Sequence, residues 1–76
     1  MNEIIHDYDQ LFDAEITLAY QFGDEYFVRV SSDDYYDHSM YRIDPVQKTV
    51  NWTTIFDWME HYQDDSTEID PSEVRL

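Results

Sequence analysis

The sequence predicts a small α+β domain, with an antiparallel sheet of three to four strands flanked by an N-terminal and a C-terminal helix. Apolar residues have helical spacing near both ends of the chain and alternate with polar residues in its middle. With 76 residues the chain can build one core only. Leu, Ile, Val and Phe make up about a quarter of the chain, above the roughly 20% below which highly charged chains stay unfolded. Seven Tyr, four Phe and two Trp add apolar surface to bury, so we expect a folded domain.

The first helix is predicted over residues 2–12. Asn2 is a suitable N-cap, and Glu3 lies where the helix dipole favours an anion, whereas Asp13 lies at the unfavourable end. One apolar stripe runs along this segment and consists of Ile4, Ile5, Tyr8, Leu11 and Phe12.

Two strands are predicted over residues 15–22 and 25–31, because apolar and polar side chains alternate in both. The turn between them runs from Phe22 to Glu25 and contains Gly23, the only glycine of the chain. The alternation places on one face of the first strand Ile16, Leu18, Tyr20 and Phe22, and points inward from the second strand Tyr26, Val28 and Val30.

A second hairpin is predicted from residues 38–44 and 48–52 around the turn Asp44-Pro45-Val46-Gln47. Thr53 or Thr54 is expected to cap a helix over residues 54–63. Its predicted buried stripe consists of Ile55, Phe56, Met59 and Tyr62. The expected domain spans residues 1–63, and the polar residues 64–76 are expected to form a mobile acidic tail with a helical turn at 71–75.

The net charge of −14 restricts the partners of the protein, because 18 acidic residues face only 4 basic ones. Direct binding of nucleic acid is excluded, since few cations are present to meet phosphates, and the expected partner is a basic protein. The chain has no cysteine and no uninterrupted apolar run longer than three residues. We therefore expect no disulfide, no signal peptide, no membrane span and a cytoplasmic location.

Catalytic and cofactor-binding motifs are weak in this sequence. Asp37, His38 and Ser39 are the nearest approach to a catalytic triad, but neighbours in a strand point to opposite faces. The protein is therefore predicted not to be an enzyme, and no cofactor is predicted. The acidic segment 33–38 is rich in oxygen ligands that suit calcium, yet it lacks the glycine and terminal glutamate of the helix–loop–helix motif. A solvated connection, a protein-binding patch and a metal site all remain open for this segment.

The acidic residues come from every predicted element, and Asp outnumbers Glu by 12 to 6. Asp is a poor helix and strand former, but its short side chain holds the charge close to the backbone. Fixed carboxylates can imitate the phosphates of DNA, which follow one another every 1.7 Å or so along the helix axis. Exposed aromatic residues beside these acids, with Tyr35, Tyr36 or Trp58 as candidates, would anchor a partner. The predicted partner-binding residues are Asp24, Glu25, Asp33, Asp34, Tyr35, Tyr36, Asp37, Asp57, Glu60, Asp64 and Asp65.

In composition and in the order of elements over residues 2–63, the chain resembles the small acidic DNA-mimic inhibitors encoded by phages, above all the anti-CRISPR proteins. Inhibitors of uracil-DNA glycosylase and of restriction enzymes are a second likeness. No diagnostic motif is shared, so no functional residue is carried over. The resemblance implies a stoichiometric inhibitor that occupies the DNA-recognition site of a CRISPR effector complex in the cytoplasm of an infected or prophage-carrying bacterium.

Other functions fit the same composition. An immunity or anti-restriction protein that neutralises a basic nuclease needs one concentrated acidic patch, whereas a DNA mimic needs carboxylates spread over some 20–30 Å. A general acidic protein-binding module, adaptation to high salt and a calcium-dependent module are further alternatives. The sequence does not predict the oligomeric state.

Overall fold

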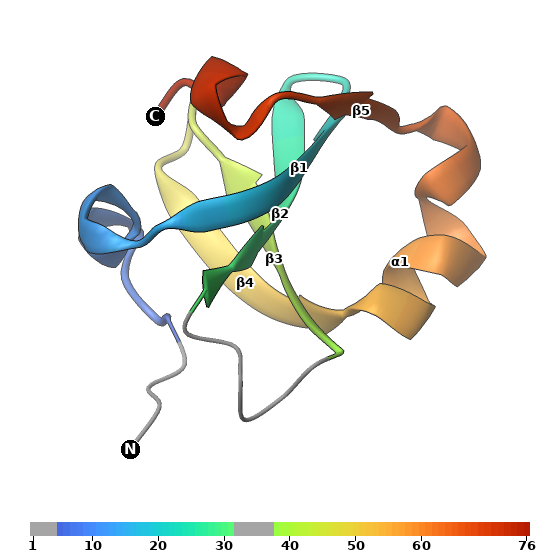
Figure 1. Ribbon diagram of the computed structural model, residues 1–76, viewed down its shortest axis with the longest axis horizontal. Helices are drawn as coiled ribbons and strands as arrows, with labels where there is room; N and C mark the ends of the chain where they lie inside the picture. Colours follow the sequence, from blue (N-terminus) through green and yellow to red (C-terminus); the bar gives the residue numbers. More distant parts are fainter. Residues whose placement is uncertain (1–4, 32–37) are drawn as a thin grey trace.

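The protein forms one five-stranded antiparallel sheet over the residues that a computed structural model describes, 5–31 and 38–76 (Figure 1). The strand order is β4-β3-β2-β1-β5. The strands are β1 (Ile16–Phe22), β2 (Glu25–Val30), β3 (Ser39–Asp44), β4 (Thr49–Thr54) and β5 (Thr67–Ile69). The helical elements described are α1 (Ile55–His61) and the short 3₁₀ turns η1 (Tyr8–Asp13), η3 (Gln63–Asp65) and η4 (Pro71–Glu73).

The prediction of three to four strands flanked by an N-terminal and a C-terminal helix is therefore wrong, because the sheet has five strands and α1 is the one α-helix of the described residues. The predicted first helix is the 3₁₀ turn η1, and Asp7 before it is extended, with φ −112° and ψ 141°. The side-chain oxygen of Gln10 accepts hydrogen bonds from the backbone N–H groups of His6 and Asp7 at 2.8 and 2.9 Å. These two bonds hold the chain before η1 in an extended path. The last turn of η1 has no basic residue to offset Asp13, so a longer α-helix is not favoured there.

The two predicted hairpins are present. In the first, Phe22 pairs with Glu25, and Gly23 has a φ of 59°, which suits the first central position of a type II′ turn. In the second, Asp44 pairs with Thr49, and the Asp44 carboxylate accepts from two backbone N–H groups of the turn, both at 3.0 Å.

Both faces of the sheet are covered, which the alternation pattern did not indicate. A register irregularity between Ile16 and Leu18 changes the phase of β1, so Ala19 lies opposite Val28 and Tyr20 opposite Phe27. One face carries a cluster packed against η1 and the C-terminal residues, and its buried members are Ile5, Tyr8, Leu11, Ala19, Tyr26, Val28, Val30, Tyr41 and Ile43. The other face lies under α1, and the buried residues between them are Phe27 and Met40 of the sheet and Trp58 of α1, with Tyr20, Phe22, Ile55 and Tyr62 packed against them.

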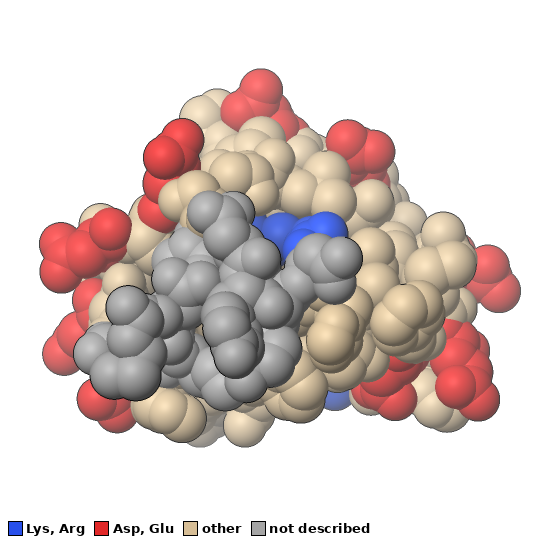
Figure 2. All heavy atoms as spheres, turned by 60° about the horizontal axis from the view of Figure 1, so that its bottom comes forward, with Lys and Arg blue, Asp and Glu red and all other residues tan. Residues whose placement is uncertain are grey.

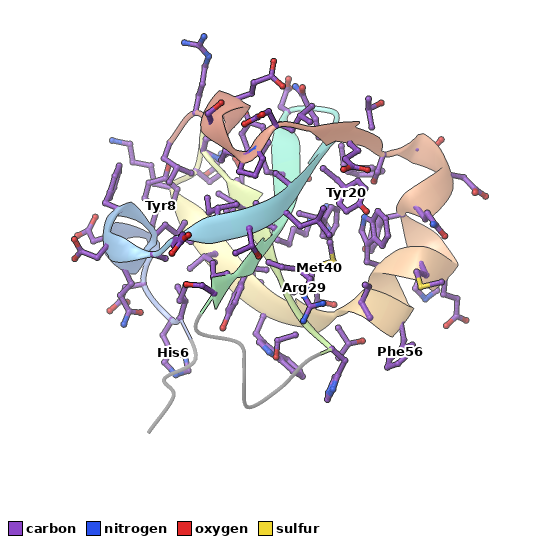
Figure 3. All side chains as sticks on the ribbon, in the orientation of Figure 1. His6, Tyr8, Tyr20, Arg29, Met40 and Phe56 are labelled. Carbon is purple, nitrogen blue, oxygen red and sulfur yellow. The ribbon has the colours of Figure 1, made fainter. Side chains whose placement is uncertain are left out.

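The helix α1 begins and ends within the predicted range, and Thr54 Oγ1 accepts from the backbone N–H of Asp57 at 3.1 Å as its N-cap. The predicted buried stripe is only half right. Trp58 is buried, with 3% of its surface exposed, whereas Phe56 and Met59 are 67% and 50% exposed. Figure 3 shows Phe56 projecting away from the sheet and Tyr20 reaching toward α1, where its ring lies 4.3 Å from that of Trp58. The larger indole, and not the Phe56 ring, therefore fills the space between helix and sheet.

The C-terminal residues belong to the sheet and its cover, although residues 64–76 were expected to form a mobile tail. The strand β5 pairs with β1, with Ala19 opposite Ile69. The hydroxyl of Tyr8 donates to the carbonyl oxygen of Leu76 at 2.7 Å, which joins η1 to the end of the chain. No helix within residues 5–31 and 38–76 has the length and apolar character needed to cross a membrane.

Candidate binding surface

The carboxylates of the described residues lie at the surface of every part of the fold. Figure 2 shows acidic side chains around the outline of one face, with uncharged residues and a basic group toward its middle. Twelve of the fourteen described acids are exposed, and Glu25 and Asp44 are half-buried. The exposed ones are Asp7, Asp9, Asp13, Glu15, Asp24, Asp57, Glu60, Asp64, Asp65, Glu68, Asp70 and Glu73.

Between described residues, one ion pair joins an Arg or Lys to a carboxylate, and it connects Arg42 on β3 with Glu25 on β2. Arg42 Nε and Nη2 donate to the two Glu25 oxygens at 2.9 and 2.8 Å, a bidentate arrangement. Arg42 Nη1 donates to the hydroxyl of Tyr62 at 3.1 Å, and the guanidinium carbon lies 5.0 Å from the centre of that ring. The hydrogen bond to Glu25 raises the pKa of Arg42 above its usual value, against the opposing effect of burial.

A groove of about 430 Å³ lies beside α1 on the same face as Phe27 and Tyr62. The alternate residues Thr49, Asn51 and Thr53 form its β4 side. Its charged lining consists of Glu25, Arg42, Asp44 and Asp57. A second hollow of about 360 Å³ is lined by both hairpin turns and shares Glu25 and Asp44 with the first.

The two hollows adjoin at Glu25 and Asp44, and we call them together the acidic depression, which extends from the two hairpin turns along β4 to Asp57 near the start of α1. Together they are lined by the carboxylates of Asp24, Glu25, Asp44 and Asp57 and by the guanidinium of Arg42, a net charge of −3. Apart from Arg42, their lining within the described part of the chain has no cation. A depression with this charge and with hydroxyl and amide groups on one side suits an arginine or lysine side chain of a partner.

Of the predicted site residues, Asp24, Glu25 and Asp57 line this depression, with Asp24 in one hollow and Asp57 in the other. Glu25 is bound to Arg42, so its charge is offset, while Asp24 and Asp57 are exposed. Glu60, Asp64 and Asp65 are exposed on α1 and η3 and do not line it. The predicted residues Asp33, Asp34, Tyr35, Tyr36 and Asp37 lie outside the described residues.

Sequence reasoning missed Asp44 as a member of the acidic depression. Successive hairpins in an antiparallel sheet place alternate turns at the same end, so the turns at Gly23 and Pro45 had to be neighbours. This topological rule was the signal in the sequence that could have identified Asp44. The proposed anchor Trp58 is wrong, because the ring is buried and its Nε1 donates to Ser66 Oγ at 3.2 Å. Among the described residues, the exposed large apolar side chains are instead Phe12, Val46, Trp52, Phe56 and Met59.

The described part of the chain holds no group of three or more His, Cys, Asp or Glu side chains placed to bind a metal ion. His61 lies 3.7 Å from Asp57 one helical turn away, and both are exposed. The chain matches no protein family, no curated protein sequence and no solved structure.

Proposed function

We propose that this protein is a stoichiometric, non-enzymatic inhibitor that occupies the DNA-binding site of a basic protein and presents carboxylates where phosphates would lie. The observation that carries this proposal is the excess of exposed acids: twelve exposed carboxylates and a single Arg–Glu ion pair among the described residues. Such an excess destabilises an isolated small domain, because like charges repel one another in the compact state. A basic partner relieves that repulsion.

The linear charge density supports DNA mimicry. The longest dimension of the molecule is 33 Å. A DNA duplex of that length carries about 19 phosphate charges, since one charge occurs per 1.7 Å or so of axis. The net charge of −14 is therefore about three quarters of the charge of an equally long piece of DNA.

The placement of the acids favours a surface recognised over its whole length. They occur on η1, on the first hairpin turn, on α1, on η3 and around β5. The acidic depression around Glu25 adds a local site for one cationic side chain. That depression is also the observation that favours the second candidate, an immunity-type inhibitor that inserts a concentrated patch into the active site of a basic nuclease.

The resemblance to anti-CRISPR proteins makes CRISPR effector complexes the first class of target to test, inside a bacterial host. The test measures binding of the protein to purified effector complexes with and without saturating duplex DNA. We expect that bound DNA abolishes binding, that the free protein has no affinity for DNA, and that added NaCl weakens the complex. Simultaneous binding of protein and DNA at unchanged affinities would eliminate mimicry.

Paired substitutions distinguish an extended surface from a local patch. Three double variants each remove two charges: Asp24→Asn with Asp57→Asn in the depression, Asp64→Asn with Asp65→Asn on η3, and Asp9→Asn with Asp13→Asn on η1. With roughly 0.5 kcal/mol per exposed ion pair, each double variant of an extended mimic loses about fivefold in affinity. A loss confined to the first variant would support the nuclease-inhibitor alternative.

The acidic segment 33–37 is tested in the same way with the triple variant Asp33→Asn, Asp34→Asn and Asp37→Asn. Removal of three like charges should retain or improve folding and should weaken inhibition. Unchanged inhibition by the folded triple variant would place the contact on the carboxylates of α1 and η3.

A further inference from the structure

The two edges of the sheet differ in how they are protected against pairing with another strand. The edge strand β5 has only three residues, carries Glu68, and is followed by Asp70 and Pro71. The edge strand β4 has six residues, Thr49–Thr54, with no charge, no proline and no glycine. Short length, charge and proline are the usual means of blocking an edge, and β4 has none of them.

The backbone of β4 exposes hydrogen-bonding groups at alternate residues. The N–H of Ile55 donates to the carbonyl oxygen of His38 at 2.8 Å, so these two residues form a hydrogen-bonded pair. Because such pairs alternate along an antiparallel ladder, Asn51 and Thr53 direct their N–H and C=O groups toward β3. Val50 and Trp52 therefore direct theirs toward the edge of the sheet, where no strand from residues 5–31 or 38–76 lies.

We propose that β4 is a self-association edge, at which a second copy of this chain adds its own β4 in antiparallel orientation. The outward backbone groups allow several two-fold symmetric registers, and we select the one in which Asn51 lies opposite Asn51 of the second copy and Val50 lies opposite Trp52 twice. In this register both Val50–Trp52 pairs are hydrogen-bonded pairs, because both residues expose their backbone groups.

Side chains support the same register. Val50 packs against the cluster that contains Tyr41, and Trp52 lies opposite Tyr41, so both side chains are on one face of the sheet. Trp52 is 43% exposed in the single chain. Because a tryptophan side chain can bury up to about 250 Å², its exposed area is on the order of 100 Å². An aromatic ring opposite a β-branched residue is a favourable cross-strand pair, and symmetry forms this pair twice.

The absence of charged side chains on β4 favours a second copy of this chain at the β4 edge over a strand from a basic partner. The carboxylates near β4 lie at its two ends, Asp44 opposite Thr49 and Asp57 at the hydroxyl of Thr53. The middle of the strand is uncharged and matches an uncharged strand of equal length, which is what a second β4 supplies. Repulsion between two chains of −14 opposes this association at low salt. The middle dimension of the molecule is 25 Å, within one Debye length at 0.01 M salt (about 30 Å) but some three Debye lengths at 0.15 M (about 8 Å).

Self-association should therefore strengthen with salt, whereas binding to a basic partner should weaken with salt. This opposite dependence keeps the proposal independent of the proposed inhibitory function. Sedimentation equilibrium at 0.01, 0.15 and 1 M NaCl measures it, and we expect the dimer dissociation constant to fall at least about tenfold over this range. A protein that stays monomeric at 1 M NaCl and millimolar concentration would overturn the proposal.

A matched pair of variants locates the contact. Asn51→Asp puts two like charges opposite each other at the symmetry axis, whereas Gln63→Glu makes the same change of charge on η3, away from β4. At 1 M NaCl we expect Asn51→Asp to weaken the dimer several-fold more than Gln63→Glu. Equal effects of the two variants would place the contact elsewhere.

Hydrogen exchange gives a readout at single backbone groups. The N–H groups of Val50 and Trp52 should exchange quickly in dilute protein and slowly in the dimer, while those of Asn51 and Thr53 are protected in both. Protection of Val50 and Trp52 only after addition of a basic partner would show that the edge takes a strand of that partner, against self-association.

Discussion

Replacement of Arg42 by methionine should destabilise the protein by about 2 kcal/mol, because it removes the one Arg–carboxylate pair of the described residues. Methionine retains much of the apolar stem but loses the bidentate bonds to Glu25 and the bond to Tyr62. Hydrogen bonds to charged groups contribute roughly 1.5–3 kcal/mol, and an exposed cation–π contact adds roughly 0.5–1 kcal/mol. The Arg42 side chain is 34% exposed, so solvent screening favours the lower end of these ranges.

The expected loss of stability reflects the contacts that Arg42 makes between separate elements of the fold. Its guanidinium joins Glu25 beside the first hairpin turn to Tyr62 at the C-terminal end of α1, with the Phe27 ring 5.7 Å away. In a domain of this size, 1 kcal/mol corresponds to a melting-temperature change of about 4–8 °C, so the variant should melt about 8–16 °C lower. Urea unfolding followed by circular dichroism measures the free energy directly.

The control for this experiment is Arg75→Met, which makes the same change of residue and of charge at an exposed position. It should alter the free energy of unfolding by less than about 0.5 kcal/mol. A double-mutant cycle with Glu25→Gln isolates the Arg42–Glu25 interaction. A coupling energy below about 0.5 kcal/mol, typical of an ordinary surface ion pair, would show that the Arg42–Glu25 pair does not stabilise the fold as expected.

Three further predictions concern charge and pH. Thermal melts from low to high NaCl should show the melting temperature rising by about 4 °C or more, roughly 1 kcal/mol, because screening relieves the repulsion of a −14 chain; a flat profile would contradict this. Bonds from the Ser72 backbone N–H and hydroxyl lower the pKa of Asp70 below its usual value of 3.8, so their contribution to stability is present above that pH and lost as pH falls through the lowered pKa. Asp70→Asn should remove this part of the acid dependence in pH-dependent unfolding, and an unchanged acid profile would argue against it. Burial, with a smaller effect of Asp44, raises the pKa of Tyr8 above 10.0, so its contribution is intact below pH 10 and lost at higher pH. Tyr8→Phe, which also removes the bond to the Leu76 carbonyl, should cost about 1 kcal/mol at pH 7 and flatten the alkaline limb; the proposed link fails if both stay unchanged.

The hairpins and the start of α1 were predictable because local chemistry decides them. Gly23 permits the positive φ of the first turn, the Asp44 carboxylate bonds the turn that follows it, and Thr54 caps the helix. The partner-binding prediction at Asp24 and Asp57 depended on the same local features, since both residues lie beside these elements. The neighbouring positions of the two hairpin turns follow from the meander of strands.

The rest depends on contacts between distant parts of the chain, which periodicity does not encode. The alternating pattern in β2 suggested one buried face, but Phe27 on the other face is fully buried by α1. The short strand β5 forms because Ile69 pairs with Ala19 and packs against the apolar cluster on that face of the sheet, although the residues next to Ile69 in the sequence are polar. The apolar stripe predicted near the N-terminus belongs in part to the 3₁₀ turn η1, in which Tyr8 and Leu11 are buried and Phe12 is 62% exposed.

The coverage of both sheet faces explains why the acids surround the molecule. Away from their ends, the strands that are paired on both sides have apolar neighbours above and below them, so a carboxylate there would be buried without a partner, at a high cost. The two acids on β2 and β3, Glu25 and Asp44, lie at the turn ends of these strands. The positions left for acids are turns, the outer side of α1, the 3₁₀ turns and the strand β5. Those positions lie at the ends and one edge of the sheet and on the outer side of the elements that cover its faces, and Figure 2 shows acidic side chains around the outline of one face. A small domain with two covered faces thus spreads its charges over its whole surface, and this spread is what the proposed mimicry of DNA requires.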